Sequence, residues 1–172
     1  MSIFTEKQFI EIVERNILAL KDRKLTISSA ESFTGGKFAS LLISRPGSSA
    51  TYVGGDIVYS DKAKILLGVK KQTLDKHTSI SAEVSKEMAF ASMKKYKSDV
   101  SISFTGNAGP LPIEGTEVGK IFITIITPLV ENTYELKLEG GRNENIDQSL
   151  SFAMKELFET LTNQRIKYEK EI

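Results

Sequence analysis

The sequence predicts an α/β protein built around a layered, mixed sheet, on three observations. Apolar residues recur at helical spacing over residues 5–21, which predicts an amphipathic helix. Strand-like runs then alternate with helix-like segments up to residue 104, a pattern typical of a parallel sheet covered by helices. Near the end, the strand-like runs 119–127 and 132–138 meet at a short connection. They predict an antiparallel hairpin, which makes the sheet mixed.

The expected elements follow from apolar periodicity and from residues that begin or end helices. Helices are expected at 5–21, 34–44, 60–67, 71–76, 81–97 and from 143 or 145 to 163, and strands at 25–29, 51–59, 99–104, 119–127 and 132–138. Thr5 and Ser81 are suitable helix caps, and Gly68 is a suitable helix end. Because a residue before proline disfavours the helical conformation, the second helix is expected to stop before Pro46.

The length and composition fit one globular domain. The chain has 172 residues, of which 40% are hydrophobic and 26% are charged. A domain of this size buries about 70% of its extended-chain surface, enough for a core without disulfides or metals. We expect a single domain over residues 1–172, with its core at about 5–163 and a charged tail at 164–172.

Charge and residue usage narrow the possible chemistry. The chain carries 23 basic and 22 acidic side chains, so its net charge of +1 gives no broad field for a polyanion, and we expect no nucleic-acid partner. Without cysteine it has no disulfide or thiolate nucleophile, and with one histidine it has no His-rich zinc site. We therefore expect neither a metal nor a cofactor. His77, in a polar turn, is interpreted as a surface or capping residue.

The chain shows no sign of a membrane location. No apolar run reaches the length of a membrane span. The first residues, MSIFTEK, lack the layout of a signal peptide. We expect a cytoplasmic protein with no membrane partner.

The first segment that can carry chemistry is AESFTGG, at residues 30–36. It follows a strand and opens a helix, the position at which ligands bind in open α/β sheets. The exposed N–H groups of a helix start favour negative charge, so Ser32 would lie where an oxyanion or phosphate is held. The alternative is that Ser32 or Thr34 merely caps the helix.

The second segment is YSDKAK, at residues 59–64, at the next strand-to-helix junction. A serine nucleophile needs a base, and with histidine nearly absent a lysine is the obvious substitute. Such a lysine must be neutral, which requires that burial or nearby positive charge lowers its pKa. Tyr59 would relay a proton or orient the lysine. The alternative is that Lys62 and Lys64 are ordinary solvated helix residues.

Two further segments are individually weak. FTGNAGP at residues 104–110 again follows a strand, and its glycines would let backbone N–H groups approach an anion. Arg142 stands before the last helix, where it could hold a phosphate with two parallel hydrogen bonds. The alternatives are a plain turn and a surface arginine.

Together, in order, these segments resemble the CinA C-terminal domain family over about residues 9–158. The motifs that carry the resemblance are AESFTGG at 30–36, PGSS at 46–49, YSDKAK at 59–64, LGV at 67–69, ISAEV at 80–84, TGNAGP at 105–110 and VG at 118–119. The resemblance implies a three-layer α/β/α fold around a mixed, mostly parallel sheet. It also implies hydrolysis of the carboxamide of nicotinamide mononucleotide, giving nicotinate mononucleotide and ammonia.

The resemblance further implies roles for individual residues. Ser32 matches the nucleophile, Lys64 the lysine that activates it and Tyr59 an assisting tyrosine. Substrate binding is expected from Thr34, Gly35, Gly36, Ser48, Thr105, Gly106 and Arg142. The chain departs from the family pattern at Phe33, where cysteine is usual, at Asn107, where isoleucine is common, at Gly141, which replaces an aspartate, and in a shortened loop at 111–116.

The leading hypothesis is thus an amidase that acts on a small nucleotide through Ser32 and Lys64. A nucleotide-binding protein without turnover is the alternative, favoured by Phe33 and the altered loop. A protein-interaction role in DNA uptake is a third possibility, with no basic surface to favour it. The family resemblance also suggests a homo-oligomer, with a dimer favoured.

Overall fold

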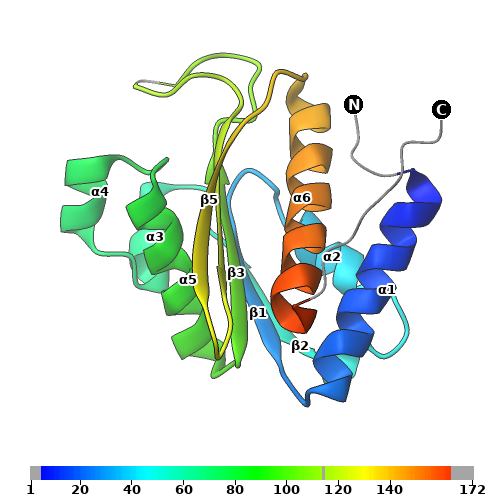
Figure 1. Ribbon diagram of the computed structural model, residues 1–172. Helices are drawn as coiled ribbons and strands as arrows, with labels where there is room; N and C mark the ends of the chain where they lie inside the picture. The colour runs from blue at the N-terminus through cyan, green and yellow to red at the C-terminus, as the bar shows by residue number, and fades with distance from the viewer. Residues whose placement is uncertain (1–4, 114, 164–172) are drawn as a thin grey trace.

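The computed structural model describes residues 5–113 and 115–163, and these form a mixed five-stranded sheet between two layers of helices (Figure 1). The strand order is β2 (Tyr52–Ile57), β1 (Ile27–Glu31), β3 (Val100–Gly106), β4 (Lys120–Ile126) and β5 (Glu131–Lys137). β1 pairs in parallel with β2 and β3, whereas β4 is antiparallel to both β3 and β5. Every strand except β4 therefore runs in the same direction, which confirms the predicted fold class.

The helices divide between the two faces of the sheet, as Figure 1 shows. One face carries α1 (Glu6–Asp22), α2 (Lys37–Ile43) and α6 (Arg142–Thr162). The other carries α3 (Asp61–Leu67), α4 (Lys71–His77) and α5 (Ala82–Tyr96). A short turn of 3₁₀ helix, η1 (Ser48–Ala50), leads into β2. None of the helices in the described ranges is long and apolar enough to cross a membrane.

The sheet presents two chemically different faces, because successive side chains of a strand point to opposite sides. The face toward α1 and α6 is aliphatic and aromatic. Its buried members include Ile27, Ile102, Phe104, Ile121, Ile123 and Ile125. The face toward α5 is rich in hydroxyl groups, and four of them form hydrogen bonds of 2.6 to 2.9 Å with residues of α5. These four are Ser28, Ser101, Ser103 and Thr124.

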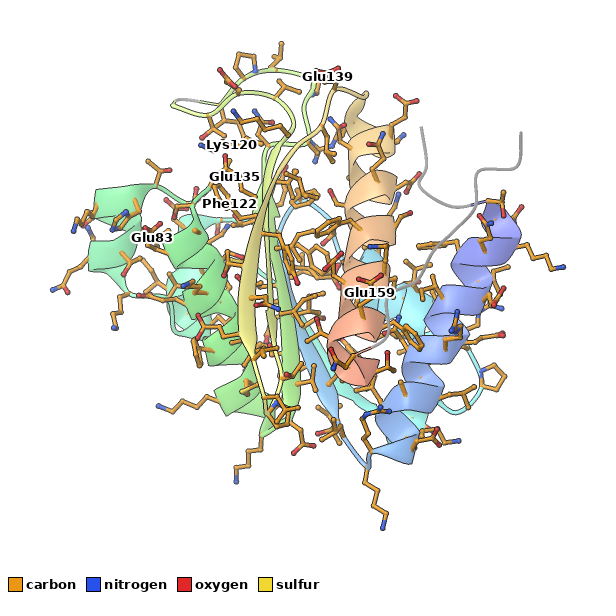
Figure 2. All side chains as sticks on the ribbon, in the orientation of Figure 1. Glu83, Lys120, Phe122, Glu135, Glu139 and Glu159 are labelled. Atoms are coloured by element: carbon orange, nitrogen blue, oxygen red, sulfur yellow. The ribbon has the colours of Figure 1, made fainter. Side chains whose placement is uncertain are left out.

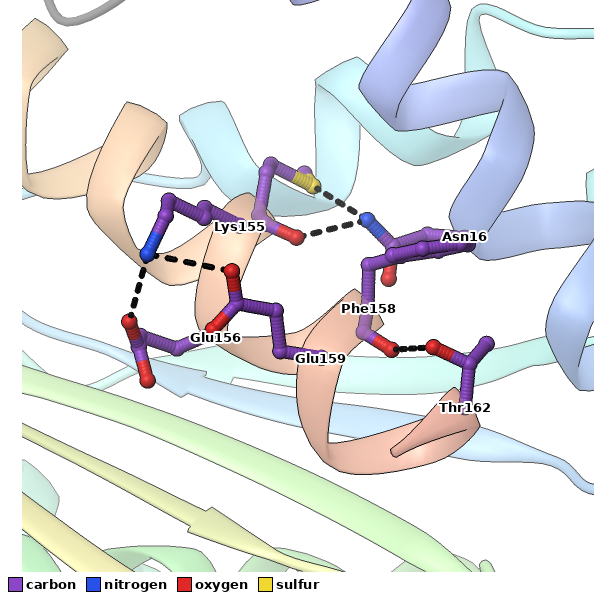
Figure 3. Close-up of polar contacts among 7 residues, drawn as sticks. Asn16, Lys155, Glu156, Phe158, Glu159 and Thr162 are labelled. Atoms are coloured by element: carbon purple, nitrogen blue, oxygen red, sulfur yellow. Dashed lines mark hydrogen bonds and ion pairs between the residues drawn. The ribbon is translucent and has the colours of Figure 1, made fainter. Parts of the chain in front are cut away.

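The layer of α1 and α6 is also joined by polar contacts (Figure 3). Asn16, fully buried in α1, donates from Nδ2 to the carbonyl oxygen of Met154 in α6 at 2.8 Å. Farther along α6, the ammonium of Lys155 lies 3.3 Å from Glu156 and 3.2 Å from Glu159. The Asn16 contact fixes how the long last helix lies beside the first, whereas the Lys155 ion pairs lie within α6.

The β4–β5 hairpin is antiparallel, as predicted. Phe122 lies opposite Glu135, and Lys120 extends over the Phe122 ring with its ammonium 5.5 Å from the ring centroid and 3.7 Å from Glu135 (Figure 2). Ion pairs as exposed as this one contribute little to stability. The pairing of β4 with the buried strand β3 is what holds the hairpin in the sheet.

The predicted element boundaries are close to those observed, with one informative exception. Thr5 caps α1, Ser81 caps α5 and Gly68 ends α3, as predicted. The second helix, however, begins at Lys37 rather than at Thr34. The preceding residues form a separate turn, so neither Ser32 nor Thr34 caps α2. The last helix starts slightly earlier than predicted, at Arg142.

Candidate active site

A cavity of about 170 Å³ opens at the edge of the sheet where β1, β2 and β3 end. This edge is where ligands bind in open α/β sheets, because the loops that follow parallel strands meet there. The cavity is lined by Ser32, Phe33, Tyr59, Lys64, Ser79, Ile80, Thr105, Gly106, Asn107, Ala108, Ile113 and Arg142. It therefore combines residues from all four segments that the sequence singled out.

Lys64 and Ser32 meet in this cavity. The side-chain nitrogen of Lys64 lies 3.3 Å from Ser32 Oγ and donates to the carbonyl oxygen of Val58 at 2.9 Å. Lys64 is only 2% exposed, and its burial lowers the pKa of the amine below its ordinary value, although the nearby Asp61 carboxylate opposes this shift. Lys62, two residues earlier, is exposed. The structure thus distinguishes a buried amine at the site from an ordinary surface lysine.

Ser32 occupies a tight turn between β1 and α2. Its side chain is 7% exposed, and its backbone N–H donates to the carbonyl oxygen of Phe104 on β3 at 3.0 Å. Within the described ranges, the N–H groups of Phe33 and Thr34 have no hydrogen-bond acceptor. Phe33 lines the cavity, so its N–H, directly after the serine, is the type of donor that stabilises an oxyanion.

The carboxylate of Glu31 caps the start of α2. Glu31 belongs to the AESFTGG motif, but no role was predicted for it. The carboxylate is 1% exposed and accepts hydrogen bonds from the N–H groups of Gly36, Phe38 and Ala39 at 2.9 to 3.1 Å. It also accepts one from the hydroxyl of Thr34 at 2.7 Å. These N–H groups are therefore already occupied, and any oxyanion donors must come from the turn itself. This role could have been predicted from the sequence, because an acidic residue shortly before a helix start is favoured by the helix dipole.

Arg142 and two asparagines hold the loop that forms the far wall. Arg142 lines the cavity and donates from Nη1 to the carbonyl oxygen of Gly109 at 2.6 Å. The side-chain amide of the fully buried Asn145 donates to the carbonyl oxygens of Ala108 at 3.0 Å and Gly140 at 2.8 Å. Asn107 accepts from the N–H of Gly109 and donates to two carbonyl oxygens of the same loop.

The end of β3 completes the cavity. Thr105 is buried and donates its hydroxyl hydrogen to the carbonyl oxygen of Ser79 at 2.7 Å, which ties the loop before α5 to the sheet. Gly106 has no space for a side chain, because a Cβ there would lie 2.5 Å from the Ile121 side chain and 2.9 Å from the backbone oxygen of Lys120. Only glycine lets the chain pass β4 this closely.

A second, larger cavity of about 480 Å³ lies between α1, α2 and α6. Its lining is mostly apolar and includes Phe9, Leu41 and Leu150, with an ion pair between Lys37 and Asp147. Among the described residues that line it, no hydroxyl group is hydrogen-bonded to a side chain that could act as a base, so size alone does not make it the candidate active site.

A model of the CinA C-terminal domain matches residues 10–161. The chain belongs to the CinA C-terminal domain family. It is 36% identical to a CinA-like protein of Flavobacterium psychrophilum over 160 residues, which are 92% of this chain but only 38% of that relative. The chain therefore spans well under half the length of this curated CinA relative.

Solved structures of CinA proteins have the same fold over nearly their whole length. A CinA superfamily protein from Klebsiella pneumoniae 700603 superimposes with a TM-score of 0.86 at 29% identity, covering 91% of this chain and 99% of that one. The competence/damage inducible protein CihA from Agrobacterium tumefaciens gives a TM-score of 0.85 at 28% identity, covering 95% and 100%. This agreement places the mixed sheet and its two helical layers within the CinA fold.

The structure brings together most, but not all, of the residues expected from the CinA resemblance. Ser32, Tyr59, Lys64, Thr105, Gly106 and Arg142 line the cavity. Tyr59 is 67% exposed, and no hydrogen bond joins it to Ser32 or Lys64 within the described residues.

Four of the expected CinA substrate-binding residues lie outside the cavity lining. Thr34, Gly35 and Gly36 form the turn behind Ser32, where Gly35 and Gly36 have φ angles of 58° and 90°. Ser48 lies in η1, at the end of the sheet where β2 begins, and its hydroxyl faces the carbonyl oxygen of Ile43. The PGSS motif at residues 46–49, which contains Ser48, forms part of the turn between α2 and β2.

Sequence reasoning gave no binding role to several residues of the CinA cavity. These residues are Phe33, Ser79, Ile80, Asn107, Ala108 and Ile113. His77 lies outside the lining, in the last turn of α4, with Nδ1 3.6 Å from Glu83. In the described part of the chain, no group of three or more His, Cys, Asp or Glu side chains is placed to hold a metal ion.

Proposed function

We propose that this protein hydrolyses the carboxamide of nicotinamide mononucleotide, with Ser32 as nucleophile and Lys64 as its base. The observation that carries the proposal is the buried amine of Lys64, 3.3 Å from Ser32 Oγ, with a pKa lowered by burial. A nucleophile within reach of a base that is itself oriented by a third group is the signature of covalent catalysis. Here the third group is the carbonyl oxygen of Val58, which accepts from Lys64.

The first half of the proposed reaction follows from this arrangement. Neutral Lys64 takes the Ser32 proton as Oγ attacks the carboxamide carbon, and one N–H of the amine stays on the Val58 carbonyl oxygen. The tetrahedral intermediate carries its negative charge on the former carbonyl oxygen. When this intermediate collapses, the C–N bond breaks, Lys64 returns the proton to the leaving nitrogen and ammonia departs.

The second half repeats the same proton transfers with water as the nucleophile. Lys64 takes a proton from water as its oxygen attacks the acyl carbon on Ser32. The C–O bond to Oγ then breaks, and the proton returns to Ser32. Nicotinate mononucleotide leaves as the acid.

The turn after Ser32 supplies the proposed oxyanion site. The N–H of Phe33 follows the nucleophile directly, belongs to a residue of the cavity lining and donates to no acceptor among the described residues. The amides at the start of α2 are held by Glu31 and are excluded from this role. Removing one oxyanion donor typically raises a barrier by about 3 kcal/mol.

Arg142 is the proposed partner of the substrate phosphate. It is the arginine of the cavity lining, and its guanidinium has five N–H donors, of which one is directed to Gly109. The remaining donors can bind phosphate oxygens while that contact keeps the side chain in place.

The decisive experiment compares Ser32→Ala with the parent protein in three measurements. We expect ammonia release from nicotinamide mononucleotide by the parent and none by Ser32→Ala, with nearly unchanged melting temperature and nucleotide binding. Ser48→Ala is a matched control, because Ser48 is also nearly buried but lies outside the cavity. Saturable binding without ammonia release by the parent would instead favour a nucleotide-binding protein without turnover.

We also propose a cytoplasmic homodimer. β2 is an edge strand, and its side chains Val53 and Ile57 are exposed, which is unusual for an edge that remains unpaired. A second copy would present the same edge. Light scattering on the purified chain should give twice the mass of 19.1 kDa, and Val53→Lys should reduce it to that of a monomer.

A further inference from the structure

Glu31, the last residue of β1, contacts both segments that carry the Ser32–Lys64 pair. Its carboxylate holds the turn that contains Ser32, through the contacts with Thr34 and with the first N–H groups of α2. Its backbone oxygen accepts from the N–H of Val58 at 2.7 Å. The backbone oxygen of Val58 in turn accepts from Lys64. One residue therefore joins the support of the nucleophile to the support of the base.

We propose that Glu31 is a positioning residue, which keeps Ser32 Oγ within reach of the Lys64 amine. The inference rests on the proposed role of Ser32 as a nucleophile. Glu31 does not line the cavity, so it acts through the turn and not on the substrate.

The hydrogen bonds of the Glu31 carboxylate span the Ser32 turn, which distinguishes a positioning residue from an ordinary helix cap. A serine or aspartate at position 36 would cap α2 locally, and residues 32–35 would then be held only by their backbone hydrogen bonds, such as that from Ser32 to Phe104. In this protein the cap position is Gly36, with no side chain, and the carboxylate reaches forward from residue 31 instead. The hydrogen bonds therefore enclose the Ser32 turn. Any change that frees the carboxylate removes this side-chain support and leaves the turn to its backbone hydrogen bonds.

The five donors also explain why a carboxylate is needed. Two oxygens receive three N–H groups and the hydroxyls of Thr34 and, at 3.5 Å, Ser29, and all of these partners are donors. An ionised carboxylate only accepts, which matches this set. In Glu31→Gln the isosteric amide would direct its own N–H donors at N–H donors. The variant therefore changes hydrogen bonding with almost no change in shape.

The test measures how fast Ser32 reacts with a fluorophosphonate probe, followed by mass spectrometry of its peptide, alongside ammonia release. Glu31→Gln should slow labelling by about 10- to 100-fold, because a displaced nucleophile loses its alignment with the base. Thr34→Val removes one of the five donors and should cause a smaller loss, of about fivefold. Turnover should fall in parallel through kcat, with KM unchanged, since Glu31 does not line the cavity.

Leu42→Val is the control for general destabilisation. Leu42 is fully buried in α2 and lies outside the cavity, so its shortening weakens the fold without touching the turn. It should label at the parent rate. If Glu31→Gln does not fold, the comparison of Ser32 labelling rates between Thr34→Val and Leu42→Val decides the question.

The pH profile of labelling gives a second readout. Burial lowers the pKa of Lys64, and the Asp61 carboxylate acts against this shift, whereas Glu31 is not among its causes. A positioning role for Glu31 therefore predicts that Glu31→Gln is labelled more slowly at every pH, with the midpoint of the pH profile unshifted. A folded Glu31→Gln or Thr34→Val that labels at the parent rate would overturn the proposal. So would a parent protein whose Ser32 is not labelled at all. Labelling that depends on Glu31, without ammonia release from nicotinamide mononucleotide, would support the role of Glu31 and reject the proposed substrate.

Discussion

Lys64 Nζ lies 3.3 Å from Ser32 Oγ although the two residues belong to different strand-to-helix junctions. Ser32 follows β1, and Lys64 lies in the helix after β2. The two strands are parallel neighbours, so their carboxyl ends reach the same edge of the sheet. The pair is therefore a product of topology, and the experiments below test whether it acts as nucleophile and base.

Replacing Lys64 by methionine should abolish turnover while the protein stays folded, because methionine fills similar space but accepts no proton. Lys62→Met is the matched control on the same helix, since Lys62 is exposed. It should keep nearly the parent kcat. Steady-state ammonia release from both variants gives the comparison, and equal losses would mean that α3 matters only for folding.

The same variant should reveal the cost of burying the Lys64 amine. Because burial lowers the pKa of Lys64 in the folded state, the unfolded chain binds more protons between that pKa and about 10.5. The stability of the parent therefore rises with pH across this window, whereas that of Lys64→Met lacks this contribution. Urea unfolding at several pH values should show the stability of Lys64→Met relative to the parent falling toward pH 10. A constant difference would indicate a Lys64 pKa near its ordinary value.

Asp61 should set the pH at which the proposed turnover begins. Its carboxylate raises the pKa of Lys64, so Asp61→Asn should lower that pKa. Since the neutral amine is the proposed base, the acid limb of kcat/KM should move to lower pH and the rate below the midpoint should increase. Asp75→Asn, which removes an exposed carboxylate paired with Lys71, should leave the limb in place.

Arg142→Ala should weaken the binding of phosphorylated substrate. Loss of a charge-assisted contact predicts a rise in KM for nicotinamide mononucleotide of about 10- to 100-fold. The riboside, which lacks the phosphate, should be affected far less. Arg45→Ala is the control, because Arg45 lies outside the cavity lining and faces Glu14. Equal increases for both substrates would mean that Arg142 only supports the loop through Gly109.

Asn145 should be important for stability rather than for chemistry. Its buried side chain satisfies the carbonyl oxygens of Ala108 and Gly140 and the N–H of Gly140. Asn145→Ala leaves these groups unpaired and should lower the free energy of unfolding by about 3 kcal/mol in a urea titration. Asn143→Ala, at an exposed position of the same helix, should change it little.

The fold could be predicted well because its signals are local and periodic. Helical spacing identified α1, and short strand-like runs between the helical segments identified the strands. The boundary of α2 was wrong because its cap is Glu31, a residue inside the preceding strand, and no local cap motif describes such a contact.

The site could be predicted only in part. Ser32 and Lys64 were correctly brought together because the family pattern identifies both. Ser48 was predicted to bind substrate because the PGSS motif resembles the family. In the structure this motif forms a turn before β2, whereas the cavity lies where β2 ends. The supporting roles of Asn145 and Asn107 depend on contacts between distant loops, which spacing along one chain does not show.

The hydroxyl-rich contact between α5 and the sheet bears on the order in which activity and structure are lost on warming. Burial of apolar surface provides most of the resistance to local opening, and this layer has a much smaller apolar cluster than the layer of α1 and α6. α3, which carries Lys64, packs on α5, whereas Ser32 lies in the turn that leads from β1 into α2, a helix of the other layer. Thermal inactivation should therefore precede the loss of helical circular dichroism, and amide hydrogens of α5 should exchange with solvent sooner than those of α6.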